Sequence, residues 1–136
     1  MRVPPEALLK QLHEAAHGLL YPSETDAPFE AFAWQNIKDD FFSIEKLLLV
    51  TRHKRDTPVE GLELEEFFAP QSRIEEWMDD TERTTAERFQ NLHDTLQHLL
   101  SDISVYRVGV VNVDVYIVGK TDDGYYAGVS TKIVET

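Results

Sequence analysis

The last third of the chain constrains the fold most, because its pattern is that of β-strands. Residues 105–119 are rich in β-branched and aromatic side chains, and apolar and polar residues alternate there, as in a strand buried on one face. The alternating apolar positions are Val111, Val113, Val115 and Ile117. Asp123-Gly124 predicts a two-residue hairpin turn, since Gly tolerates the positive φ of such turns. A further strand is predicted from residue 125 to Thr136, the last residue of the sequence.

Two amphipathic helices are predicted from apolar residues that recur three or four positions apart. The first begins at Pro4-Pro5 and ends near Gly18, while the second begins with Thr84 or Thr85 as its cap. The apolar face of the first helix comprises Leu8, Leu12, Ala15, Ala16 and Leu19. The apolar face of the second comprises Phe89, Leu92, Leu96, Leu99, Leu100 and Ile103.

Shorter elements are predicted between these two helices. Residues 29–34 and 57–60 favour short strands. Ser43 can cap a helix over the apolar run that ends at Val50, although this run also fits a buried strand. We favour the helix for this segment, 41–51.

The acidic middle of the chain predicts two short helices. Residues 62–68 favour a helix that ends before Pro70, because proline disrupts a helix interior. Ser72 and Glu75 have the spacing of a capping box, which predicts a second helix that carries Trp77. Helices followed by grouped strands are typical of the α+β class with a mainly antiparallel sheet, here expected as one domain over residues 1–136.

The charge of the chain limits its direct partners. Its 25 Asp and Glu residues against 13 Lys and Arg give a formal net charge of -12. Nucleic acids and anionic membranes bind clustered cations, so neither is expected as a direct partner. A basic protein would instead be attracted over a distance, although an acidic surface also simply keeps a protein soluble.

The remaining composition indicates an ordinary cytoplasmic protein. There are 0 Cys residues, which excludes disulfides, thiolate nucleophiles and cysteine zinc sites. We see no apolar run long enough to cross a membrane, and residues 1–5 lack the pattern of a signal peptide. A cytoplasmic location is therefore expected.

One short motif could carry catalysis. His13, Glu14 and His17 match H-E-x-x-H on the first helix, where in zinc peptidases the histidines bind the metal and the glutamate is the general base. A catalytic zinc also needs a third protein ligand, and Leu20 and Ser23 occupy the positions where the extended pattern has Gly and His. We therefore favour surface residues here, predict no cofactor and no enzymatic activity, and keep a zinc peptidase as an alternative.

A run of acidic residues surrounds Trp77. Two interpretations stay open: Trp77 packs under a helix while the acids face water, or Trp77 is an exposed anchor for a basic protein surface, because Trp is enriched at interface centres. The acidic residues are Glu60, Glu63, Glu65, Glu66, Glu75, Glu76, Asp79, Asp80 and Glu82.

Separated stretches of the chain together resemble the nuclease A inhibitor family. They are Gly18-Leu19-Leu20, Ser23-Glu24, Pro28-Phe29-Glu30, Phe67-Phe68 before Trp77, Val105–Gly109, Asp114–Tyr116 and Ala127–Thr136. The family consists of small acidic proteins that block sugar-non-specific, metal-dependent nucleases. The resemblance implies an α/β/α-like sandwich and a protein that inhibits such a DNA/RNA endonuclease by entering its active site.

The resemblance also implies which residues bind the nuclease. Carried over by position they are Glu24, Glu75, Trp77 and Thr136, with Thr136 expected to contact the metal ion of the partner nuclease. Glu75 departs from the family, which has Gln at this position. The chain is expected to hold no metal of its own, and the alternative function is an acidic module that binds another basic protein.

Overall fold

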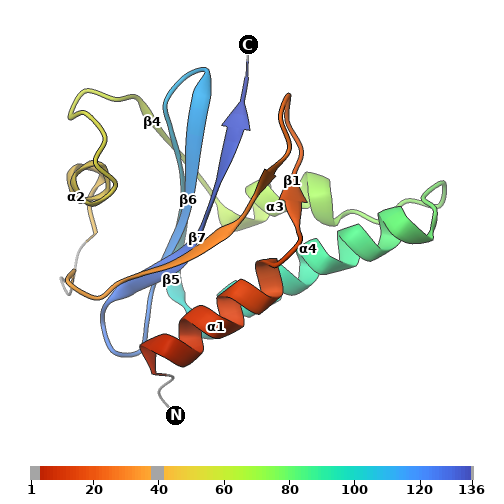
Figure 1. Cartoon of the computed structure of the whole chain (residues 1–136), viewed down its shortest axis with the longest axis horizontal. Helices are drawn as coiled ribbons and strands as arrows, with labels where there is room; N and C mark the ends of the chain where they lie inside the picture. Colours follow the sequence, from red (N-terminus) through yellow and green to blue (C-terminus); the bar gives the residue numbers. More distant parts are fainter. Residues whose placement is uncertain (1–3, 38–41, 136) are drawn as a thin grey trace.

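The computed structural model describes residues 4–37 and 42–135, so Phe41 and Thr136 lie outside the described residues. The described residues form four helices, a five-stranded antiparallel sheet and a two-stranded ribbon (Figure 1). The order of strands in the large sheet is β3-β7-β6-β5-β4. The α+β class and the antiparallel sheet predicted from the sequence are confirmed.

The three C-terminal strands form the centre of this sheet. They are β5 Ser101–Val108, β6 Asn112–Lys120 and β7 Tyr126–Val134, each antiparallel to the next. The edge strands are β3 Glu30–Trp34, which pairs with β7, and β4 Val59–Leu62, which pairs with β5. The alternation in β6 has the predicted effect, because Val113, Val115 and Ile117 are all buried.

Three details of this region differ from the sequence predictions. Val111 lies in the turn between β5 and β6 and is 45% exposed, because the strand pattern begins only after that turn. The connection from β6 to β7 is longer than two residues, since Thr121 N donates to Tyr125 O, and Gly124 takes a φ of +92°. Strand β7 ends at Val134 rather than at the last residue.

Three helices cover one face of the sheet: α1 Pro5–Ala16, α3 Leu64–Ser72 and α4 Asp80–Leu99. Figure 1 shows α1 and α4 running alongside each other beneath this face. The main core lies between them and the sheet, and Leu12, Leu92 and Ile117 are fully buried there. Within the described residues no helix is long and apolar enough to span a membrane; α4 has the length but is too polar.

The short helix α2 Ile44–Val50 packs on the opposite face of the sheet. Its Leu47 and Leu48 meet Val108 of β5 in a second, smaller core. Ser43 caps this helix, because its hydroxyl accepts a hydrogen bond from Lys46 N at 3.2 Å. The helix favoured over a buried strand in this segment is confirmed, and helices on both faces give the α/β/α-like sandwich.

The sequence predictions were wrong about where α3 ends and where the next helix begins. Helix α3 continues through Pro70 to Ser72, because a proline near the end of a helix removes few bonds while the buried Phe67 and Phe68 hold the turn before it. Residues 73–79 form no helix, so Ser72 and Glu75 are not a capping box.

The capping box lies at the start of α4 instead. The Asp79 side chain accepts from Glu82 N at 2.8 Å, and the Glu82 carboxylate accepts from Asp79 N at 3.2 Å. Thr84 and Thr85 lie inside α4, where their hydroxyls donate to carbonyls one turn earlier. Ile103, predicted to extend the face of this helix, belongs to β5.

Candidate partner-binding surface

Glu24 lies at the tip of a narrow hairpin. Strands β1 Leu20–Tyr21 and β2 Ala27–Pro28 pair antiparallel and enclose the loop that the sequence marks by its prolines and small polar residues. The Ser23 hydroxyl donates to Thr25 O at 2.7 Å, and the Ser23 hydroxyl oxygen accepts from Thr25 N at 3.3 Å. These local bonds define the turn on which Glu24 is exposed to solvent.

The hairpin is bonded to the last strand of the sheet. Val134 N donates to the Ser23 hydroxyl oxygen at 3.2 Å, and the Thr131 hydroxyl donates to Pro28 O at 3.0 Å. Figure 1 shows the hairpin and the end of β7 at the same edge of the molecule. The structure therefore brings Glu24 close to the end of β7, while Thr136 itself lies outside the described residues.

Trp77 lies on a tight turn between α3 and α4. Met78 N donates to Glu75 O at 3.2 Å, which closes the turn and places Trp77 at its corner. Trp77 is 72% exposed. The interpretation that Trp77 packs under a helix is therefore wrong, because the segment forms no helix that could cover it.

Several contacts hold the Trp77 turn together and join the segment between α3 and α4 to α4. The Met78 sulfur accepts from Glu75 N at 3.4 Å, and Arg83 Nε donates to Met78 O at 3.2 Å. At the other end of the turn, Gln90 donates to Ser72 O at 2.8 Å. Side chains of α4 thus hold both ends of the segment, so Trp77 is presented on an ordered support.

The capping box gives the first testable consequence. Asp79→Ala should lower the free energy of unfolding by about 1 kcal/mol, because the backbone N–H of Glu82 loses its partner at the start of α4. Chemical denaturation measures this change. Asp94→Ala, also on α4 but far from its first turn, is the control and should cost less. An equal loss in both variants would contradict the role assigned to the cap.

A hollow lies between the base of the hairpin and the start of α4. It has a volume of about 500 Å³ and lies between residues 18–20 and the first two turns of α4, including Asp80 and Thr84. Leu20 lines this hollow and is 48% exposed, unusual for a leucine beside the main core. The base of the hairpin and the first turns of the helix that follows Trp77 therefore border the same hollow.

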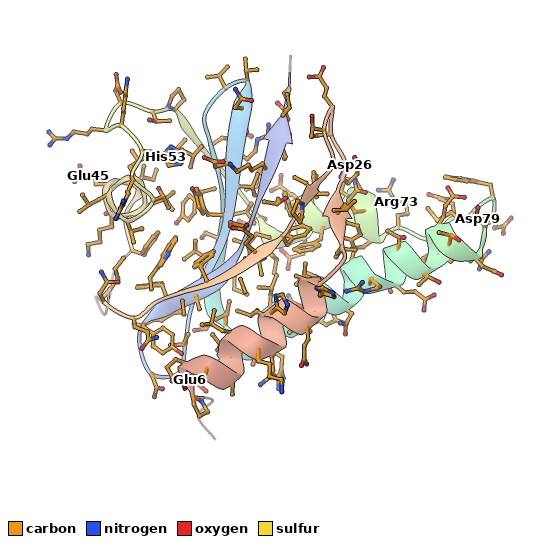
Figure 2. The ribbon with its side chains drawn as sticks, in the orientation of Figure 1. Glu6, Asp26, Glu45, His53, Arg73 and Asp79 are labelled. Carbon is orange, nitrogen blue, oxygen red and sulfur yellow. The ribbon has the colours of Figure 1, made fainter. Side chains whose placement is uncertain are left out.

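The exposed charges around the Trp77 turn are mostly negative. Glu76, Asp79, Asp80 and Glu82 are all exposed around the Trp77 turn, and Glu75 is half-buried in it. In Figure 2, Asp79 at the start of α4 and Asp26 on the hairpin lie on the two elements that flank the hollow. An acidic surface with an exposed indole suits a basic protein partner, because rim charges guide encounter and Trp supplies contact area.

The H-E-x-x-H residues lie on α1 and at its C-terminal end, and none of them lines the hollow beside Leu20. His13, Glu14 and His17 are exposed, and the two imidazole rings lie 5.3 Å apart between centroids. Among residues 4–37 and 42–135, no three His, Asp or Glu side chains are grouped so that they could hold a metal ion. A catalytic zinc needs a third protein ligand, so the described residues do not support a peptidase site.

A second hollow, of about 370 Å³, lies on the α2 side of the sheet. Asp114 and Tyr116 line it, and His53 Nε2 lies 3.2 Å from a carboxylate oxygen of Asp114 and 3.2 Å from the hydroxyl of Tyr116. Burial raises the pKa of Tyr116, and the negative charge of Asp114 raises it further. Glu24, Glu75 and Trp77 are not among the described residues that line this hollow, although Ala27 and Pro28 of the hairpin are.

Sequence comparison adds one finding to this geometry. A family model described as nuclease A inhibitor-like protein matches residues 6–136, nearly the whole chain. No curated protein matches the sequence.

Proposed function

The chain belongs to the nuclease A inhibitor-like family, and we propose that it inhibits a sugar-non-specific DNA/RNA endonuclease by occluding the metal-containing active site of that enzyme. It would act as a single domain in the cytoplasm, as a binding protein and not as an enzyme, and protect the producing cell. One observation supports the proposal most: the hairpin that carries Glu24 is bonded to the end of β7 through Ser23 and Val134.

The proposed contacts follow from the chemistry of a nuclease active site. Such a site holds a hard divalent cation, which prefers oxygen ligands, and basic residues arranged for phosphate. In our proposal Thr136 contacts the metal ion, while Glu24 pairs with a basic residue that otherwise binds the nucleic-acid backbone. The hydrogen bond between Ser23 and Val134 supports these two contacts, because it keeps the hairpin that carries Glu24 next to the end of β7.

Trp77 and Glu75 would contact the enzyme outside the metal site. Trp77 offers an indole that is already exposed, so its burial against the nuclease would supply apolar contact area. Glu75 is not occupied by a capping box, and its backbone N and O are both used within the turn. Its carboxylate is thus a candidate acceptor for a basic side chain, in place of the Gln found in the family.

Residual cleavage of both DNA and RNA measures the proposed activity. A metal-dependent, sugar-non-specific nuclease is titrated with the full chain at nuclease concentrations above the expected Kd. Both activities should fall together to zero near one equivalent, since one active site serves both substrates. If cleavage continues unchanged while another basic protein binds the chain tightly, the alternative of a general acidic interaction module is correct.

The net charge predicts how fast the complex forms. Because the chain carries a formal charge of -12, the association rate constant with a basic nuclease should fall about tenfold or more between low and physiological salt. Stopped-flow mixing of the two proteins at several salt concentrations measures it. The dissociation rate constant is the internal control, because charges at the rim of an interface affect mainly association. A salt-independent association rate would contradict electrostatic steering.

A further inference from the structure

One face of α4 carries three polar side chains at a spacing of seven residues, a set we call the polar stripe. Its members are Arg83, Gln90 and Gln97. Seven residues are close to two full turns of an α-helix, so the three side chains lie along one face of α4. Each of them donates a hydrogen bond to the chain that precedes α4. Gln97 bonds the Glu65 carboxylate in the first turn of α3 at 3.3 Å, so the polar stripe begins alongside that helix.

The other two members of the polar stripe bond both ends of the segment between α3 and α4. Gln90 Nε2 donates to the carbonyl of Ser72, the last residue of α3, at 2.8 Å. Arg83 Nε donates to the carbonyl of Met78, just before the cap of α4, at 3.2 Å. The exposed Trp77 lies between these two bonded positions.

Met78 connects the polar stripe to the turn itself. Its backbone N–H donates to Glu75 O at 3.2 Å, and its sulfur accepts from Glu75 N at 3.4 Å, so Met78 closes the turn from both its backbone and its side chain. Arg83 bonds the carbonyl of this same residue. The side chain of Arg83 therefore acts on Trp77 through the residue that closes the Trp77 turn.

We propose that Arg83 and Gln90 are positioning residues for Trp77 in the complex with the nuclease. They hold the Trp77 turn in a fixed relation to α4 before the partner arrives. A segment that is ordered before binding loses less conformational entropy in the complex, which raises affinity without any new contact. This inference rests on the proposed function, and it assigns both residues a role through the Trp77 turn and not through contact with the nuclease.

Simultaneous substitution of both residues tests the proposal. Arg83→Met combined with Gln90→Leu should weaken inhibition of the nuclease about tenfold, because the turn must then be ordered on binding. Both hydrogen bonds are exposed to solvent, so the melting temperature should stay nearly unchanged. An inhibition constant equal to that of the parent chain would overturn the proposal.

Two control variants separate positioning from charge and from helix packing. Arg55→Met makes the same charge change in the exposed loop after α2. Gln97→Leu removes the member of the polar stripe that bonds α3 and not the segment with Trp77. Both controls should inhibit like the parent chain. If either control loses as much inhibition as the double variant, the effect belongs to charge or to helix packing, and the positioning role is wrong.

A comparison in the absence of the indole gives the deciding result. With Trp77→Ala already present, the substitutions at Arg83 and Gln90 should cause little further loss of inhibition, because the group that they position is gone. An equal loss with and without Trp77 would overturn the proposal. If the parent chain inhibits no nuclease at all, the proposed function itself fails.

A measurement without nuclease tests the positioning independently of the proposed function. The NMR order parameters of the Glu76 and Trp77 amides should fall in the double variant, toward the range below about 0.6 that marks flexible backbone. The amide of Leu92, a fully buried residue of α4, serves as the rigid reference. Unchanged order parameters at Glu76 and Trp77 would overturn the positioning role even if the chain is a potent inhibitor.

Discussion

Deletion of Thr136 should weaken inhibition on the order of 100-fold or more, because removing one partner of a desolvated charge contact costs several kcal/mol. The deletion moves the terminal carboxylate back to Glu135, whose side chain and backbone N are both engaged by the protein. The new end would therefore reach the metal poorly. The inhibition constant against the nuclease, with the parent chain measured in parallel, gives the size of the effect.

The fold should tolerate this change, which makes the result easy to interpret. Strand β7 ends at Val134, so removal of Thr136 leaves every pair of the sheet in place. The melting temperature should stay unchanged. An extension of a few Gly and Ser residues after Thr136 should weaken inhibition comparably, since it displaces the carboxylate while keeping the side chain. Unchanged potency in both variants would contradict a metal contact by Thr136.

Trp77→Ala is expected to cost about 2 kcal/mol of binding free energy, roughly a 30-fold weaker complex, as for a central interface residue. The loss should appear mainly in the dissociation rate constant, because Trp77 carries no charge that could guide the encounter. Surface plasmon resonance with the immobilised nuclease separates the two rate constants.

Leu49→Ala is the matched control for this substitution. Leu49 is 79% exposed on α2, on the opposite side of the sheet from α4, so the substitution removes a similar exposed apolar side chain away from the Trp77 turn. Neither variant should unfold the protein, because neither side chain fills the core. Equal effects of the two substitutions on binding would mean that Trp77 has no particular role.

The sequence predicted the elements that follow a strong hydrophobic period. Apart from Val111 and Ile103, the alternation in β6 and the apolar faces of α1 and α4 were predicted correctly, because burial imposes a period of two on strands and about 3.6 on helices. Ser43 was also predicted correctly as a cap, since a hydroxyl just before an apolar run can accept from a free backbone amide in the first turn of a helix.

The segment between α3 and α4 was predicted wrongly for a physical reason. Ser72-x-x-Glu75 and Asp79-x-x-Glu82 both have the spacing of a capping box, and spacing alone cannot tell which one has a helix behind it. The long α4 formed after the second, and the first became part of a turn closed by Glu75 and Met78. Trp77 is exposed because residues 73–79 form a turn and not a helix that packs on the core.

The hydrophobic periodicity of the sequence could not predict which residues lie together on the candidate surface. Ser23 and Val134 are far apart in the sequence, and no local pattern indicates that a hydroxyl of one bonds the amide of the other. The family resemblance supplied Glu24, Glu75, Trp77 and Thr136 as separate positions. The hollow with Leu20 emerged only from the packing of the hairpin against α4.

Displacement of a bound oligonucleotide tests the central claim most directly. An uncleavable, fluorescently labelled single strand is bound to the metal-loaded nuclease, and the full chain is added while anisotropy is followed. Occlusion of the active site predicts that the label returns to its free value near one equivalent of the chain, and that the Thr136 deletion requires far more. A complex in which chain and oligonucleotide stay bound together would contradict occlusion, even if cleavage is inhibited.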